Sequence, residues 1–112
     1  MRIAIPMADG KLALHFGHCE QFALVDVDTD SKRILATRIS DAPEHQPGLL
    51  PRWLAQEGAN MIIAGGMGSR AQNLFAEQGI AVLVGAPAET PERLVQTWLN
   101  GALQPGDNAC DH

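Results

Sequence analysis

The sequence predicts a single α/β domain built on a five-stranded mixed sheet with three helices. Its 112 residues suit one compact domain, and 46% of them are hydrophobic, enough to build a core. Alternating apolar residues in the first 40 positions indicate strands. Beyond position 49, segments with helically spaced apolar residues alternate with short continuous apolar runs, a pattern typical of strand-helix-strand crossovers.

The first 40 residues read as an antiparallel meander of three strands. Residues 2–7 alternate like a short strand, and residues 22–28 and 33–40 give two more. The turn-forming stretch Asp28-Thr29-Asp30-Ser31 joins the second and third strands.

Three helices and two strands are expected after the loop at residues 41–48. The first helix has a common apolar face and ends at Gly58; the face is formed by Leu49, Leu50, Trp53 and Leu54. Residues 61–64 form a continuous apolar run, as expected for a strand buried on both faces. Ser69 and Gln72 have the spacing of a capping box, which opens a second helix ending near Gly79.

Apolar runs and helix-end signals also predict the last strand and the last helix. Residues 80–84 are a second apolar strand, and Thr90 and Pro91 supply an N-cap and a first-turn proline for a helix that stops at Gly101. Because crossovers join parallel strands, the predicted sheet order is 3-2-1-4-5. That order reverses between strands 1 and 4, where open α/β sheets bind ligands. The loops at residues 8–19, 41–48 and 65–69 should share this edge.

Charge and composition exclude some classes of partner. A net charge of -5 with only 8 basic residues argues against nucleic acid or an anionic membrane. No apolar run approaches the roughly 20 residues that cross a bilayer, so we expect a cytoplasmic protein. In that compartment two cysteines are expected to be thiols, which favours metal or redox chemistry, although a Cys19–Cys110 bridge is the alternative.

Cysteine and histidine residues gather in two short stretches, which predicts a metal site. Five donors can share the predicted edge: His18, Cys19, His45, Cys110 and His112. Thiolate and imidazole are ligands of borderline and soft metals, and residues 102–112 can span up to ~33 Å, more than the ~20 Å height of such a sheet. The spacing matches no strong zinc signature, so surface histidines with one half-buried thiol are the competing interpretation. Cysteine–histidine catalysis is a further alternative, but no nucleophile elbow accompanies these residues.

A glycine-rich loop supports a different kind of site. The stretch Gly66-Met67-Gly68-Ser69-Arg70-Ala71 fits G-x-G-x-x-A after an apolar strand and before a helix. Amide groups at the start of a helix suit an anion, so a nucleotide- or anion-binding regulatory module that uses residues 65–69 is the second hypothesis. A tight strand-to-helix turn explains the same glycines without any ligand.

The chain resembles the dinitrogenase iron-molybdenum cofactor biosynthesis family, which includes NifX-like proteins and the C-terminal part of NifB. The resemblance rests on the first strand, the His15-Phe16-Gly17 element, the Gly65-Gly66-Met67-Gly68 loop and the order of elements. It covers residues 1–104 as one domain and leaves residues 105–112 as a tail that carries Cys110-x-His112.

This resemblance implies a ribonuclease H-like fold and a binding edge with which we associate His15, Phe16, Gly17, Gly65, Gly66, Met67, Gly68 and Ser69. It also implies binding or carriage of iron-sulfur clusters, some containing molybdenum, although a single zinc or iron ion would suit the same donors. We therefore expect a non-enzymatic metal or cluster carrier that serves a cluster-assembly or acceptor protein. A thiol redox switch is the remaining alternative, and the sequence does not predict an oligomeric state.

Overall fold

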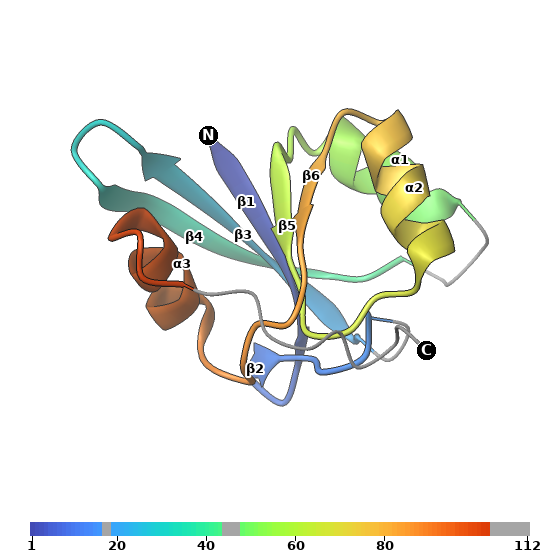
Figure 1. The fold of residues 1–112 in the computed structure, drawn as a ribbon, viewed down its shortest axis with the longest axis horizontal. Coiled ribbons are helices and arrows are strands. Elements are labelled where there is room, and N and C mark those ends of the chain that lie inside the picture. Colours follow the sequence, from blue (N-terminus) through green and yellow to red (C-terminus); the bar gives the residue numbers. More distant parts are fainter. Residues whose placement is uncertain (17–18, 44–47, 104–112) are drawn as a thin grey trace.

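The computed structural model describes residues 1–16, 19–43 and 48–103. Along the chain it has six strands and three helices (Figure 1): β1 (Arg2–Ala8), β2 (Lys11–Leu12), β3 (Gln21–Asp28), β4 (Arg33–Asp41), α1 (Leu49–Gln56), β5 (Met61–Ile63), α2 (Ser69–Glu77), β6 (Ala81–Leu83) and α3 (Pro91–Leu99).

All six strands belong to one mixed sheet, so the prediction of five strands is wrong by one. The order β4-β3-β1-β5-β6 has the predicted arrangement of the other five, with β1 antiparallel to β3 and parallel to β5. The additional strand, β2, pairs antiparallel with the end of β1. A two-residue turn makes this hairpin, in which Asp9 (φ 54°) and Gly10 (φ 79°) both adopt the left-handed conformation that such turns require.

Helices cover both faces of the sheet (Figure 1). On one face α3 packs its buried residues Leu94, Val95 and Leu99 onto β1, β3 and β5. On the other face α1 and α2 contribute Leu50, Leu54 and Phe75 to a second core cluster. Both faces of β5 are therefore buried, as its apolar run predicts, because Ile63 packs in the first cluster and Ile62 in the second.

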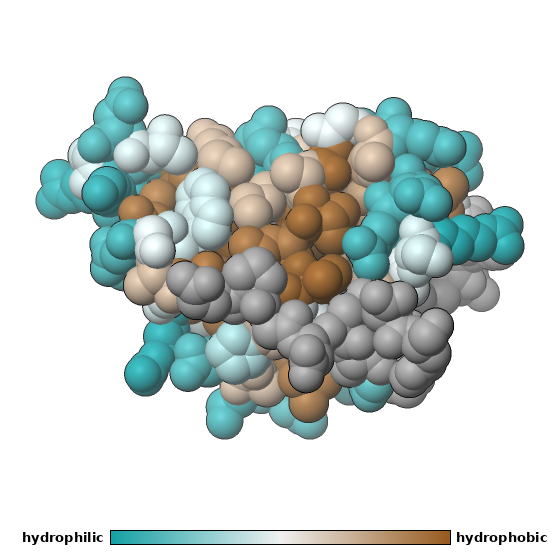
Figure 2. Space-filling model, in the orientation of Figure 1, coloured by the Kyte–Doolittle hydropathy of each residue, from teal (hydrophilic) through white to brown (hydrophobic). Residues whose placement is uncertain are grey.

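The edge strand β6 is only partly covered. Its residues Val82 and Leu83 and the following Val84 are half-buried, and apolar residues reach the surface between α3 and the α1–α2 pair (Figure 2). Within the described ranges no helix is long and apolar enough to cross a membrane.

The helix ends agree with the sequence except at the start of α2. Gly58, Gly79 and Gly101 follow the three helices with positive φ angles, as helix-terminating glycines do. The capping-box prediction is wrong, because Gly68 is the N-cap of α2 and Ser69 is already its first residue. Gln72 instead donates from its side-chain amide to the carbonyl of Met67, 2.9 Å away.

Candidate functional site

Loops from three parts of the chain meet at the carboxyl end of the sheet. A parallel bridge joins His15 in the loop after β2 to Gly66 in the loop after β5. Two hydrogen bonds make it: the Phe16 amide donates to the Gly66 carbonyl (2.9 Å), and the Gly66 amide donates to the Leu14 carbonyl (2.6 Å). The loop after β4 begins at the same end of the sheet, where the Ala42 amide donates to the carbonyl of Glu20, the residue before β3, at 3.0 Å.

Phe16 fixes the first loop to the core. Its ring makes edge-to-face contacts with Phe75 of α2 (centroids 5.5 Å apart) and Phe22 of β3 (6.3 Å). The prediction grouped Phe16 with ligand-contacting residues, whereas in the structure this ring packs against the second core cluster. The neighbouring His15 is exposed, so the same dipeptide anchors the loop and presents an imidazole.

Cys19 lies beneath this edge. It is only 5% exposed and belongs to the core cluster that also contains Phe22 and Met67. Burial raises the pKa of its thiol to about 11, because a thiolate loses hydration in apolar surroundings. At neutral pH this cysteine is therefore a protonated thiol unless a bound cation replaces its proton.

The glycine loop is shaped by packing against the first loop. A Cβ at Gly65 would lie 2.9 Å from the carbonyl oxygen of Leu14, closer than real Cβ contacts allow. The Gly65 carbonyl accepts from Gly85 at 2.6 Å, and the Gly66 amide is occupied by Leu14. Gly65 therefore has a structural reason, and the occupied Gly66 amide leaves fewer groups for an anion than the motif indicates. Gly68 differs, because a Cβ there would meet nothing within 4 Å.

The remaining predicted ligands lie outside the residues that the structure describes. They are Gly17, His18, His45, Cys110 and His112. Among the described residues, no group of three or more His, Cys, Asp or Glu side chains is placed to hold a metal ion. Of the predicted metal ligands, the structure therefore places Cys19 alone, below the edge to which His15, Gly66 and Met67 contribute.

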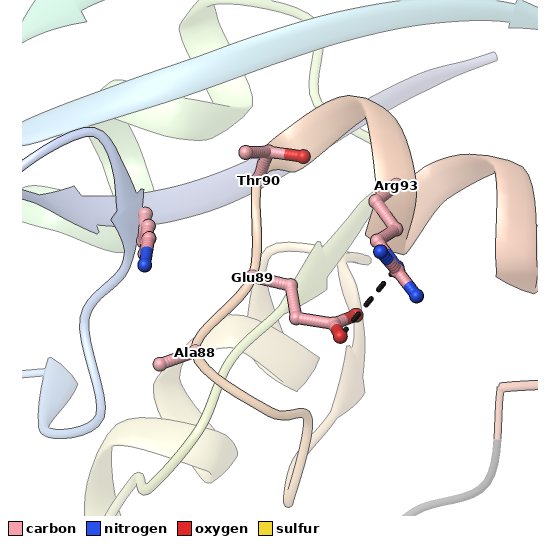
Figure 3. Close-up of a pocket in the computed structure, with 5 residues that line it drawn as sticks. Ala88, Glu89, Thr90 and Arg93 are labelled. Atoms are coloured by element: carbon pink, nitrogen blue, oxygen red, sulfur yellow. Dashed lines mark ion pairs between the residues drawn. The ribbon is translucent and has the colours of Figure 1, made fainter.

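A pocket of about 340 Å³ adjoins the same side of the sheet and was not predicted. Its lining comes from β2, from the connection between β6 and α3 and from the first turn of α3: Lys11, Ala88, Glu89, Thr90 and Arg93. Figure 3 shows Glu89 and Arg93 turned toward each other across their ion pair, with N and O atoms 3.5 Å apart. The sequence signal for this pocket was the Asp9-Gly10 turn, which places Lys11 on a hairpin.

Comparison with known proteins shows one family. The family model described as dinitrogenase iron-molybdenum cofactor matches residues 1–101. The uncharacterized protein MJ0580 of Methanocaldococcus jannaschii is 27% identical over 107 residues, a match that covers 93% of this chain and 90% of that protein.

Solved structures have the same fold. PH0822 superposes with a TM-score of 0.85 at 27% identity, covering 94% of both chains. The apo form of the orange protein from Desulfovibrio gigas gives a TM-score of 0.73 at 26% identity, covering 96% of this chain and 93% of that one. A putative dinitrogenase (mj0327) from Methanocaldococcus jannaschii gives 0.74 at 20% identity, covering 96% of both chains.

Proposed function

The chain belongs to the dinitrogenase iron-molybdenum cofactor family, and from this premise we propose that it is a non-enzymatic protein that binds and carries a metal ion or a metal-sulfur cluster. The cargo is an iron-sulfur cluster, with or without molybdenum, and zinc or iron alone is the simpler alternative. The site is the carboxyl edge of the sheet, in a fold of the ribonuclease H-like type.

One observation carries this proposal: the His15–Gly66 bridge joins two loops at the carboxyl edge of the sheet, and the residues that follow it, Phe16 and Met67, pack in the core cluster that contains Cys19. This edge is where the strand order reverses, between β1 and β5. Ligands of open α/β sheets bind at such a point, because the loops on either side diverge there.

Chain connectivity keeps the other proposed ligands within reach of this edge. His18 adjoins Cys19, so their Cα atoms are ~3.8 Å apart. His45 follows Ala42 by three residues, which limits their separation to ~10 Å. Residues 104–112 can extend ~30 Å beyond Leu103, so Cys110 and His112 can come from the far side of the sheet.

The chemistry of these donors suits a soft or borderline metal. Two thiolates and up to three imidazoles provide four-coordination with a donor to spare, and Asp9, Glu44 and Asp111 are the acceptors that would orient the imidazole rings. Since burial raises the pKa of Cys19 to about 11, the metal must displace a proton there. We therefore expect affinity to increase with pH, and to go on increasing to a higher pH than at a site with exposed thiols.

A carrier needs a donor or acceptor for its cargo. We propose a cluster-assembly or acceptor protein as the partner, in the cytoplasm, where thiols stay reduced.

The proposal is tested by purifying the chain anaerobically and measuring bound metal, sulfide and the visible absorption spectrum. We expect metal in the native chain and its loss in Cys19→Ala and Cys110→Ala, while the matched surface variant Thr37→Ala on β4 keeps it. Visible absorption with acid-labile sulfide indicates a cluster, whereas zinc gives neither. Absence of metal from the native chain, or unchanged content in both cysteine variants, refutes the proposal.

The same preparation separates the carrier from the anion-binding alternative. Thermal stabilisation by a nucleotide that is lost in Gly68→Val and kept in Cys19→Ala would support a regulatory module at residues 65–69. Reversible Cys19–Cys110 bridging without bound metal would support a redox switch.

A further inference from the structure

β4 is an open edge of the sheet along its whole length. It stands at one end of the strand order and pairs on one side, with β3. Apart from Ile34 and Ser40, which are half-buried, its nine residues are exposed. The opposite edge strand, β6, has only three residues. Because an edge strand presents unpaired N–H and C=O groups, β4 is the longer of two surfaces on which another extended chain can pair.

The free backbone groups of β4 belong to its odd-numbered residues from Thr37 onward. In an antiparallel pair, residues that exchange hydrogen bonds alternate with residues that do not. The Ala42 amide donates to the Glu20 carbonyl at 3.0 Å, and the register of β4 on β3 continues without a shift from there to Ala36. Even-numbered positions therefore bond to β3, whereas Thr37 and Ile39 direct their amide and carbonyl groups away from it.

Two large apolar side chains are exposed on this strand. Leu35 is 65% exposed and Ile39 is 47% exposed, and they are two of the four exposed large hydrophobic residues in the described part of the chain. Leu35 occupies a bulge, because Ile34 and Ala36 have partners on β3 and the leucine between them has none. A single copy therefore leaves both side chains in water, and a partner that covers them gains their burial.

The sequence of β4 is complementary to itself in one antiparallel register. When two copies align at Thr37, each Leu35 lies opposite the Ile39 of the other copy, and Thr37 lies opposite itself. Apolar pairs and Thr–Thr pairs directly opposite each other stabilise antiparallel strands. The same register brings the Arg33 end of one strand to the Asp41 end of the other, so opposite charges lie at both ends of the pair.

The neighbouring registers lack this match. Alignment at Arg38 sets two arginines opposite each other and Leu35 opposite Asp41. Like charges directly opposite each other destabilise paired strands. Alignment at Ala36 leaves neither of the exposed apolar side chains opposite another apolar one. The alignment at Thr37 is therefore favoured over both neighbours that use the same free backbone groups.

We propose that β4 is the surface through which two copies of this chain associate, pairing antiparallel about Thr37 to form one continuous sheet. The interface is symmetric, because the same strand contributes from both copies. β4 and β1 are each antiparallel to β3, so they run in the same direction. The antiparallel pairing of two β4 strands therefore puts the two carboxyl edges at opposite ends of the joined sheet, and both candidate sites stay accessible.

The first test measures the mass of the full-length chain by sedimentation equilibrium. A chelator and a reducing agent are present, so that neither metal nor a disulfide can link the copies. The paired segment is short, so we expect a weak dimer with a dissociation constant on the order of 10–100 μM. A chain that stays monomeric at about 1 mM overturns the proposal.

Amide hydrogen exchange gives the local readout on the same samples. The amides of Thr37 and Ile39 should exchange more slowly as the protein concentration rises, because they gain partners in the second copy. The amide of Arg38, which is turned to β3, is the internal control and should not change. Association that leaves the exchange of Thr37 and Ile39 unaltered places the interface elsewhere and overturns the proposal.

Charged substitutions test the register. Leu35→Lys should raise the dissociation constant at least about tenfold, because the lost apolar contact occurs twice in a symmetric interface. Ile39→Glu should act in the same way. Leu35→Lys combined with Ile39→Glu should restore association, since each new cation then lies opposite a new carboxylate of the other copy. Leu14→Lys, at an exposed leucine outside β4, is the matched control and should leave association unchanged.

Each variant's amide spectrum is compared with that of the native chain to verify its fold. Dimerisation that Leu35→Lys does not weaken overturns the proposed surface, and a double variant that associates no better than the two single variants overturns the register. All samples are free of metal, so none of these outcomes depends on the carrier proposal.

Discussion

Gly65 lies so close to Leu14 that a Cβ at position 65 would stand 2.9 Å from the Leu14 carbonyl oxygen and 3.0 Å from its Cα. The atoms in the way belong to the backbone and cannot turn aside as a side chain does. Gly65 therefore allows the loop after β2 to lie on the loop after β5, which is the contact that forms the candidate site.

Gly65→Ala should consequently separate the two loops. We expect the free energy of unfolding to fall by about 1–3 kcal/mol, the usual cost of forcing an extra carbon into a packed position. Urea unfolding measures this loss, and amide chemical shifts of His15, Phe16 and Gly66 report whether the bridge is broken.

Gly68→Ala is the matched control in the same loop. A Cβ there meets nothing within 4 Å, so the only expected cost is a poorer N-cap for α2, under ~1 kcal/mol. Equal destabilisation by the two variants would contradict the role we give to Gly65.

Phe16→Ala should weaken the packing of the loop after β2 against the core. The ring contacts both Phe22 and Phe75, so its removal leaves a cavity and should cost about 2–4 kcal/mol, less than a fully buried phenylalanine because Phe16 is half-exposed. Leu14→Ala, at a side chain that is 53% exposed, should change stability by less than ~0.5 kcal/mol. Thermal unfolding of both variants provides the comparison, and a similar loss in each would show that Phe16 is not the anchor.

Much of this fold follows from local sequence signals. Alternation gives β1, β3 and β4, the apolar run of β5 indicates burial on both faces, and Gly58, Gly79 and Gly101 stop the helices. The strand order follows from the rule that crossovers are right-handed and join parallel strands. The Asp9-Gly10 turn could also have been predicted, because hairpin turns with positive φ at both central residues favour the Asp-Gly dipeptide. That turn would have predicted the short strand β2 after it.

Features that depend on tertiary packing could not be predicted from local sequence signals. Ser69 has the spacing of a capping residue, but the N-cap lies one residue earlier, at Gly68, and Ser69 is the first residue of the helix. Phe16 belongs to the His15-Phe16-Gly17 element, which predicts contact with a ligand. Only the proximity of Phe22 and Phe75 in the folded chain shows that its ring packs in the core. The burial of Cys19, and with it the raised pKa, likewise depends on residues far away in the sequence.

Arg2 and Asp26 should make stability depend on acid pH. The guanidinium donates from Nε at 2.7 Å and from Nη2 at 3.2 Å to the two carboxylate oxygens, and this contact lowers the pKa of Asp26 from 3.8. Stability from this pair is therefore complete above pH 3.8 and is lost as pH falls through the lower folded-state pKa.

Asp26→Asn should remove that dependence. We expect a loss of about 1 kcal/mol at pH 7, modest because the two side chains are 34% and 38% exposed, and a smaller loss at pH 2. Urea unfolding at both pH values tests it. Asp30→Asn, in the exposed turn after β3, is the control and should leave the pH profile unchanged.

Cys19 should control stability at alkaline pH. Because burial raises the thiol pKa from 9.0 to about 11, the unfolded chain loses this proton first, and stability should decline between about pH 9 and 11 by up to ~2.7 kcal/mol. For the same reason, alkylation of Cys19 by iodoacetamide at pH 7 should be at least ~100-fold slower than in urea, where the thiol has its ordinary pKa. Cys19→Ala should flatten the alkaline part of the stability profile. Alkylation in the folded chain at the rate seen in urea would show that the thiol is not held protonated in the core.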